Sequence, residues 1–192
     1  NRSPAFAQLR IDVTAPLARI SAELNRFRPD LLSGDLGAIA ALAAEQLAGR
    51  LEISQRLVSC TAEQLTDRAR ATIREAWTEP FDVYSTTETG GMLAIECGAH
   101  EGLHLREDAC IVEVVDERDR PVPDGERGSA LLVTSWLNRT LPLVRYRIED
   151  SVRVSSEPCR CGRATRRVVE LGGRREDTLR LPGADGGLVP VH

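Results

Sequence analysis

The stretch that decides the fold is LLSGDLGAIAALAAEQLAG, residues 31–49. It opens on the apolar pair Leu31 and Leu32, which is typical of the start of a short buried strand. Asp35 then offers a helix N-cap, and Gly49 offers a helix stop. The apolar residues between these signals recur on one helix face: Leu36, Ile39, Ala40, Ala43 and Leu47. The stretch therefore predicts a strand followed directly by a helix.

The same pattern repeats on both sides. Upstream lies a helical stripe made of Leu17, Ile20, Leu24 and Phe27. Downstream, apolar runs at residues 57–59 and 81–84 enclose a third helix, whose stripe is Leu65, Ala69, Ile73, Ala76 and Trp77. Thr61 with Gln64 can form a capping box ahead of that helix, and Thr66 is a rival cap. This alternation predicts parallel βαβ units.

After Met92 the chain changes to strands separated by turns. The candidate strands are residues 92–95, 109–116, 128–135, 143–148, 152–154, 167–171 and 178–181. The predicted fold class is therefore α/β, a parallel βαβ layer followed by a mostly antiparallel, β-barrel-like subdomain. We expect an α/β part over residues 1–95, a β-rich part over 96–181, and the start of a linker at 182–192.

The composition is that of a globular protein. The 192 residues are 42% hydrophobic and 28% charged, which suits one domain or one domain with a small satellite. The net charge of -4 gives no general attraction to nucleic acid or to an anionic membrane. No stretch approaches the roughly 18 apolar residues of a membrane span, and the start lacks the blocks of a signal peptide. We therefore expect a cytoplasmic protein.

All 25 basic residues are arginines, because the sequence contains no lysine. Codon bias in a GC-rich genome accounts for such a composition. Its chemical consequence holds whatever the origin, since any step that needs a lysine lies beyond this chain's own residues.

A hydroxyl-rich loop follows the run at 81–84: Tyr84-Ser85-Thr86-Thr87-Glu88-Thr89-Gly90-Gly91. Hydroxyls donate to phosphate oxygens, and the carboxylate of Glu88 offers a hard oxygen to Mg²⁺. Loops of Ser, Thr and Gly are more often only loops. Farther on, the charged residues of 145–150 alternate along a strand, which also suits a solvated face with cross-strand ion pairs.

Taken in order, three segments resemble those of a known family. They are residues 84–88, residues 141–150 (LPLVRYRIED) and residues 170–179 (ELGGRREDTL). They resemble the Tyr-Gly-x-Thr-Glu, Arg-Tyr-Arg-Thr-Gly-Asp and Gly-Arg-x-Asp-Asp segments of adenylate-forming enzymes, particularly of the phenylacetate-CoA ligase family. The flanks at 36–51 and 59–66, and Glu96-Cys97 leading to Gly102-Leu103-His104, look similar too. The resemblance covers nearly the whole chain and implies part of that family's large lobe.

The resemblance also implies roles for single residues. Tyr84 would stack on adenine, and Thr87 would touch the phosphates beside Glu88, which would hold Mg²⁺. Asp150 would accept hydrogen bonds from the ribose hydroxyls, and Arg174 would bind near the ribose and phosphates. The nucleotide-binding set also includes Ala62, Glu63, Ser85, Thr86 and, at the hinge to a small lobe, Glu176.

The implied activity is ATP-dependent activation of a carboxylic acid, an aromatic one by analogy with the family. The acyl-adenylate would pass to coenzyme A or another thiol, and the partners would be ATP and the small acid, with a homodimer allowed. A second reading is a non-catalytic, zinc-stapled module that binds a nucleotide or acyl group. A third is a zinc-stabilised interaction domain, in which the hydroxyl loop has no ligand.

The sequence departs from the family pattern in several places. Ser85 replaces Gly, Ile148-Glu149 replaces Thr-Gly, and Glu176 replaces the usual hinge Asp. Ser85 fits only if its backbone φ is negative. The phosphate loop and the C-terminal lobe with its adenylating lysine are missing, so we expect negligible adenylation by this polypeptide alone.

The cysteines predict a metal site. Five is an odd number, and Cys159 and Cys161 are too close for an ordinary mutual disulfide. Cys97 with His104 or His100 would complete four ligands for a closed, structural Zn²⁺. The alternative is buried, inert thiols, which is the expected state of Cys60 and Cys110. The family resemblance selects His104 as the fourth ligand.

Overall fold

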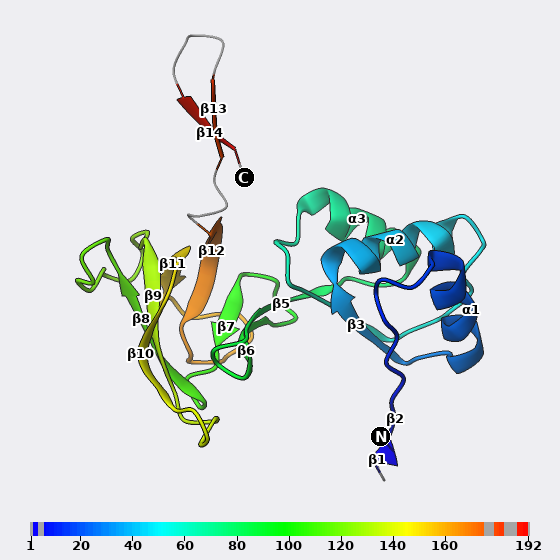
Figure 1. Ribbon diagram of the computed structural model, residues 1–192, viewed down its shortest axis with the longest axis horizontal. Coiled ribbons are helices and arrows are strands. Elements are labelled where there is room, and N and C mark those ends of the chain that lie inside the picture. Colours follow the sequence, from blue (N-terminus) through cyan, green and yellow to red (C-terminus); the bar gives the residue numbers. More distant parts are fainter. Residues whose placement is uncertain (1, 4–5, 175–178, 183–187, 192) are drawn as a thin grey trace. The chain divides into compact units, whose positions relative to one another are not determined.

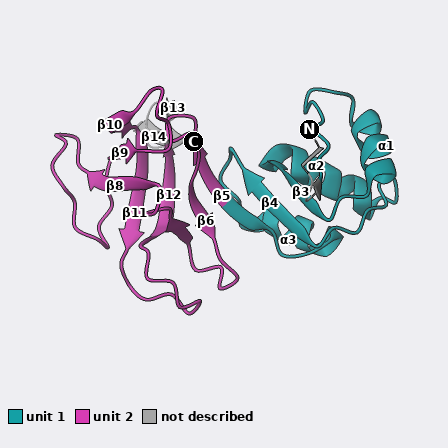
Figure 2. Ribbon diagram, turned by 90° about the horizontal axis from the view of Figure 1, so that it is seen from below, with its two compact units in different colours: residues 1–82 teal, residues 83–192 magenta. Residues whose placement is uncertain are grey.

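The computed structural model describes residues 2–3, 6–174, 179–182 and 188–191 (Figure 1). The chain forms two compact units, unit 1 over residues 1–82 and unit 2 over residues 83–192 (Figure 2). The expected boundary lay after Ile95. The observed boundary falls earlier, because the strand after Gly91 pairs antiparallel with strands of unit 2 rather than with the parallel strands of unit 1.

Unit 1 is the predicted parallel βαβ layer. Its strands are β3 (Leu31–Asp35), β4 (Leu57–Thr61) and the first residues of β5 (Phe81–Thr86). All are parallel, with Leu31 opposite Leu57 and Ser59 opposite Phe81. Its helices are α1 (Leu17–Phe27), α2 (Leu36–Leu47) and α3 (Asp67–Ala76). Two short strands, β1 (Arg2–Ser3) and β2 (Phe6–Ala7), pair with each other.

Most residues of the predicted apolar helix stripes are buried or half-buried, but Leu17, Phe27 and Leu47, at helix ends, are 37%, 36% and 47% exposed. Ile39, Val58 and Ile73, from α2, β4 and α3, are each no more than 2% exposed in one shared core. The cap of α3 is Thr66, whose Oγ1 accepts from the Ala69 amide at 3.3 Å. The capping box at Thr61 was therefore wrong, because Thr61 is the last residue of β4.

Unit 2 consists of antiparallel strands. The end of β5 pairs with β6 (Gly91–Glu96), and the order continues through β7 (Leu103–Leu105), β12 (Arg167–Arg174) and β11 (Asp150–Ser155). A second sheet has the order β10 (Leu143–Ile148), β9 (Ala130–Ser135) and β8 (Cys110–Val115). β13 (Leu179–Pro182) corresponds to the strand expected at 178–181. It pairs with β14 (Leu188–Val191), which lies in the region expected as a linker, where residues 183–187 and 192 are outside the described chain.

The two sheets of unit 2 share one core. Leu93, Val152 and Val168 from the first sheet pack in the same cluster as Val112 and Val133 from the second. All five are at most 2% exposed. This arrangement is the β-rich, barrel-like subdomain that the strand pattern predicted. Within the described residues, no helix is both long enough and apolar enough to span a membrane.

Candidate functional site

Two motif residues far apart in the sequence meet inside unit 2. Tyr84 lies on β5, and Asp150 is the first residue of β11, 66 positions later. The Tyr84 hydroxyl donates a hydrogen bond to Oδ2 of Asp150. Both residues are buried, at 8% and 6% exposure. The two halves of the motif therefore converge, although their sequence spacing alone gives no reason for it.

The contact uses the hydroxyl of Tyr84, while its ring packs in the core cluster with Leu93 and Val152. At 8% exposure the ring leaves little free face. The direct partner of Tyr84 is thus the carboxylate of Asp150, a contact that the sequence does not predict.

The residues of the hydroxyl-rich turn differ in solvent exposure. Thr86 and Thr89 are buried, at 6% and 3% exposure, whereas Thr87 is exposed and Glu88 is half-buried. The hydroxyl of Thr86 lies 3.0 Å from that of Thr89, so it is used within the turn. Only Thr87 and Glu88 present polar groups outward from the middle of this turn.

The backbone of the turn tolerates the departure at Ser85. Ser85 does not have a positive φ, which was the condition for a side chain at that position. The left-handed conformations fall on Gly90 and Gly91, with φ of 75° and 139°. Glycine adopts these values without a steric penalty.

Arg174 lies close to Asp150 through the backbone. The two residues are Cα partners where β12 pairs with β11. Arg174 therefore belongs to the same end of unit 2 as Tyr84. Glu176, the expected hinge residue, lies outside the described residues.

Ala62 and Glu63 follow β4 in unit 1. Ala62 has a φ of 70°, a left-handed conformation that is uncommon for a residue with a Cβ. Glu63 accepts a hydrogen bond from the Gly37 amide at 3.2 Å through Oε1. Gly37 lies in the first turn of α2, where a carboxylate also interacts favourably with the helix dipole.

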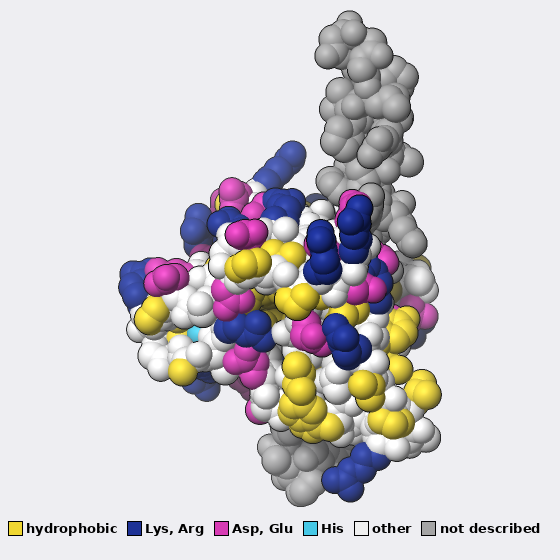
Figure 3. All heavy atoms as spheres, turned by 90° about the vertical axis from the view of Figure 1, so that its left-hand side faces the viewer, with side chains coloured by type: hydrophobic (Ala, Val, Ile, Leu, Met, Phe, Trp, Pro, Cys, Tyr) yellow, Lys and Arg dark blue, Asp and Glu magenta, His cyan; other side chains and the backbone are white. Residues whose placement is uncertain are grey.

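The charged residues of 145–150 fall into two groups, arginines in ion pairs on a solvated face and a buried aspartate. Nε of Arg145 lies 3.0 Å from Oε2 of Glu113, and Nε of Arg147 lies 2.7 Å from Oε1 of Glu149. These two arginines belong to a solvated face with ion pairs. Figure 3 shows basic and acidic side chains interspersed over this side of unit 2. Asp150 differs from them because it is buried and bonded to Tyr84.

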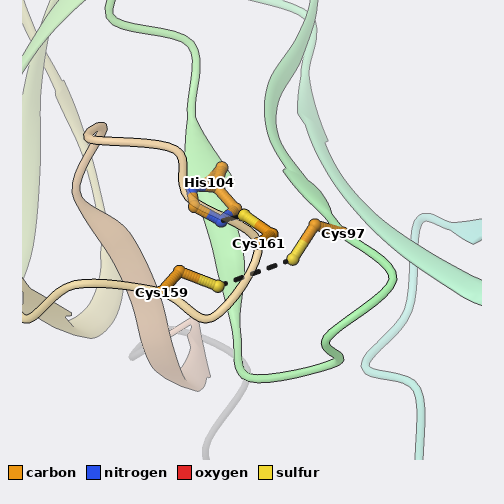
Figure 4. A group of neighbouring side chains, drawn as sticks. All are labelled: Cys97, His104, Cys159 and Cys161. Carbon is orange, nitrogen blue, oxygen red and sulfur yellow. Dashed lines mark hydrogen bonds between the residues drawn. The ribbon is translucent and has the colours of Figure 1, made fainter.

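Four potential metal ligands cluster in unit 2 (Figure 4). Cys97 follows β6, His104 lies on β7, and Cys159 and Cys161 lie between β11 and β12. Their ligand atoms all lie within 4.8 Å of one another. The Sγ atoms of Cys97 and Cys159 are 3.7 Å apart, and Sγ of Cys161 lies 3.3 Å from Nε2 of His104.

The 3.7 Å and 3.3 Å separations of the two pairs of ligand atoms suit one tetrahedral zinc ion. Zinc–sulfur bonds of about 2.3 Å place two thiolates about 3.8 Å apart, and a thiolate about 3.6 Å from an imidazole nitrogen. Three thiolates and one imidazole are also the soft and borderline donors that zinc prefers. The residues present therefore suit a closed site with no position left for water.

The orientation and pKa of His104 are compatible with metal binding. Its Nδ1 lies 2.9 Å from Oγ1 of Thr165, an outer contact that orients Nε2 toward Cys161. Burial, with the nearby positive charge of Arg163, lowers the pKa of His104, which favours the neutral imidazole. His100 is outside the cluster, with its Nδ1 3.2 Å from Oε2 of Glu96.

The two sites lie at opposite ends of the same strands. β6 runs from Gly91, at the hydroxyl turn, to Glu96, beside Cys97. β11 runs from Asp150 towards the loop that carries the other two cysteines. Of the residues that support the two sites, Thr89 belongs to the quoted hydroxyl-rich loop but was given no role, and Ser135 and Thr165 were missed because no motif marks them.

Known proteins resemble much of the chain. It is 30% identical over 169 residues to the phenylacetate-coenzyme A ligase of Thermus thermophilus, covering 84% of this chain and 38% of that ligase. The Pseudomonas putida phenylacetate-coenzyme A ligase is 31% identical over 169 residues, with the same coverage of 84% and 38%. No protein-family model matches the chain.

A solved structure shows the same fold. It is a 2-hydroxyisobutyryl-CoA ligase in complex with R3-HIB-AMP, with a TM-score of 0.77 and 22% identity over 86% of this chain and 37% of that one. The chain thus spans less than two fifths of the length of its relatives, at 38% and 37%. Over the part that it spans, the chain belongs to the phenylacetate-CoA ligase family of adenylate-forming enzymes.

Proposed function

We propose that the chain is the nucleotide-holding part of an AMP-forming acid–thiol ligase. The reaction joins ATP and a carboxylic acid to an acyl-adenylate with release of pyrophosphate. The thiol of coenzyme A then loses its proton and takes the acyl group, and AMP leaves. The observation that carries this proposal is the buried contact between Tyr84 and Asp150. In this proposal the contact joins two of the three family segments at one place.

Each residue of this end has a role in the proposal. Asp150 accepts the ribose hydroxyls, because a carboxylate can take both at once. Thr87 donates to the phosphates, and Glu88 offers an oxygen to Mg²⁺, which neutralises developing charge when bound. Arg174 supplies a fixed positive charge near the ribose and phosphates.

The acid is an aromatic one in this proposal. Its support is the name of the relatives, which are phenylacetate-coenzyme A ligases. Turnover belongs to a longer assembly, since the transferred adenylyl group needs a cationic clamp and this chain contains no lysine. The chain itself therefore binds nucleotide without appreciable adenylation.

Nucleotide binding tests the proposal directly. AMP is titrated calorimetrically into the wild-type chain, into Asp150→Asn and into the matched control Glu149→Gln. Asp150→Asn loses the charge on the ribose acceptor and is expected to weaken AMP binding by about tenfold, whereas Glu149→Gln keeps it within about twofold. Equal affinities of wild type and Asp150→Asn would remove the ribose role. Absence of AMP binding by the wild type would favour the zinc-stabilised interaction domain.

We also infer that Cys97, His104, Cys159 and Cys161 hold one structural zinc ion. The support is their donor chemistry and the 3.7 Å and 3.3 Å separations of the paired ligand atoms. When bound, the ion supplies cross-links among loops and not chemistry, because four protein ligands leave no open position. Elemental analysis of freshly purified protein is expected to give one zinc per chain, and a value near zero would contradict the inference.

A further inference from the structure

Thr89 is a buried threonine in the hydroxyl turn, and the proposed nucleotide chemistry does not use it. It is 3% exposed. Its Oγ1 donates to the Thr86 carbonyl at 3.1 Å or to the Gly91 carbonyl at 2.9 Å, and it lies 3.0 Å from Oγ1 of Thr86. One hydroxyl therefore contacts both ends of the turn.

The same residue is also connected to the second sheet of unit 2. Ser135, the last residue of β9, donates from its Oγ to the Thr89 carbonyl at 3.5 Å. Ser135 is 4% exposed, and 46 positions separate it from Thr89. The turn is thus tied to β9 as well as closed on itself.

These contacts restrain the backbone on both sides of Thr87 and Glu88. Thr87 and Glu88 lie between the two buried threonines; Thr87 is exposed and Glu88 is half-buried. A backbone hydrogen bond from the Gly90 amide to the Thr87 carbonyl, at 3.0 Å, further restricts the backbone of the turn. The orientation of Glu88 therefore depends on the inward contacts of Thr89.

We propose that Thr89 is a positioning residue that holds Glu88 and Thr87 toward Mg²⁺ and the polyphosphate of ATP, with Ser135 as its anchor. This role rests on the proposed function. It concerns the metal and the outer phosphates only, because the ribose carboxylate of Asp150 comes from β11 and accepts a hydrogen bond from Tyr84. Loss of Thr89's hydroxyl should therefore affect Mg·ATP more than metal-free AMP.

The test measures both ligands by calorimetry on the full chain. Thr89→Val keeps the shape and removes the hydroxyl, Thr89→Ser restores it, and Ser135→Ala removes the anchor. Thr72→Val is the matched control, because its hydroxyl bonds only within α3, to the Arg68 carbonyl. Thr89→Val is expected to weaken Mg·ATP by about tenfold and AMP in EDTA by less than about twofold.

The other three variants are expected to differ in their affinity for Mg·ATP. Thr89→Ser should recover most of the Mg·ATP affinity, Thr72→Val should match the wild type, and Ser135→Ala should lose about threefold, since its hydrogen bond is long. Should Thr89→Val fail to fold, the Ser135→Ala and Thr89→Ser pair carries the same comparison.

The outcomes separate this role from the proposed function. Equal losses of both ligands in Thr89→Val, or no loss of either, overturn the positioning role while leaving nucleotide binding intact. A wild-type chain that binds neither ligand refutes the proposed function and the positioning role together. Selective loss of Mg·ATP with recovery in Thr89→Ser is the result that supports it, because a merely structural threonine would not distinguish the two ligands.

Discussion

Replacing Tyr84 by Phe removes the hydroxyl that donates to Asp150 and leaves the ring in place. The acceptor is a carboxylate, and hydrogen bonds to charged groups contribute about 1.5–3 kcal/mol to stability. Water cannot readily replace the lost donor, because Tyr84 and Asp150 are only 8% and 6% exposed. We therefore expect Tyr84→Phe to lower the free energy of unfolding by about 2 kcal/mol.

A double-mutant cycle isolates the pair from other effects of each substitution. Urea unfolding is measured for the wild type, Tyr84→Phe, Asp150→Ala and the double variant. The cavity left by Asp150→Ala is common to two corners of the cycle and cancels. A coupling energy of about 1.5–2 kcal/mol is expected, and a value below about 0.5 kcal/mol would refute the contact as a source of stability.

AMP titration of the same variant distinguishes two roles of Tyr84. Tyr84→Phe retains the aromatic ring, so stacking on adenine predicts unchanged affinity. Positioning of Asp150 by the hydroxyl predicts a loss of about tenfold. The buried ring in the core cluster favours the second result.

Three further variants and treatments test other parts of the structure. Chelation should lower the free energy of unfolding by about 4 kcal/mol relative to protein in zinc at a thousand times its Kd, and Cys161→Ser but not Cys110→Ser should lose zinc by elemental analysis. Ala62→Gly should raise unfolding stability by about 0.5 kcal/mol, since relief of roughly 1–2 kcal/mol at its left-handed φ exceeds the entropy cost of glycine; a loss of stability would contradict this. Thr66→Ala should cost about 1 kcal/mol in urea unfolding and Asp35→Ala almost nothing, because among the described residues only Thr66 caps its helix through its side chain; equal effects would argue against that cap.

The sequence predicts the three helices of unit 1 from their apolar stripes, although only the stripe at 36–47 has both a start signal and a stop signal. It predicts strands less completely. β7 has only three residues and a polar His104 at its centre, so it shows neither an apolar run nor a useful alternation. The position of the unit boundary was missed because β5 pairs parallel with β4 at its start and antiparallel with β6 at its end. Residue periodicity is the same for both kinds of pairing.

The candidate sites also contain features that the sequence predicts and features that it does not. The clustering of Cys97, His104, Cys159 and Cys161 was predicted, with the family resemblance selecting His104 over His100. The supporting contacts were not predictable, because Ser135 and Thr89 are ordinary hydroxyl residues separated by 46 positions. Their importance comes from burial and from partners that only the folded chain brings together.

The metal cluster and the hydroxyl turn are too far apart to influence each other strongly through charge. β6 joins them with six residues, which extend about 19–20 Å at the usual rise per residue, and two unit charges that far apart interact by less than about 1 kcal/mol at an effective dielectric constant of about 20. Any effect of zinc on the turn must therefore pass through strand pairing, since the cluster fixes the ends of β6, β7 and the β11–β12 connection. Chelation should then speed amide exchange at Thr87 and Gly90 by the same factor at low and high ionic strength. A salt-dependent change would indicate an electrostatic route, and no change at the turn would confine the zinc to a local role.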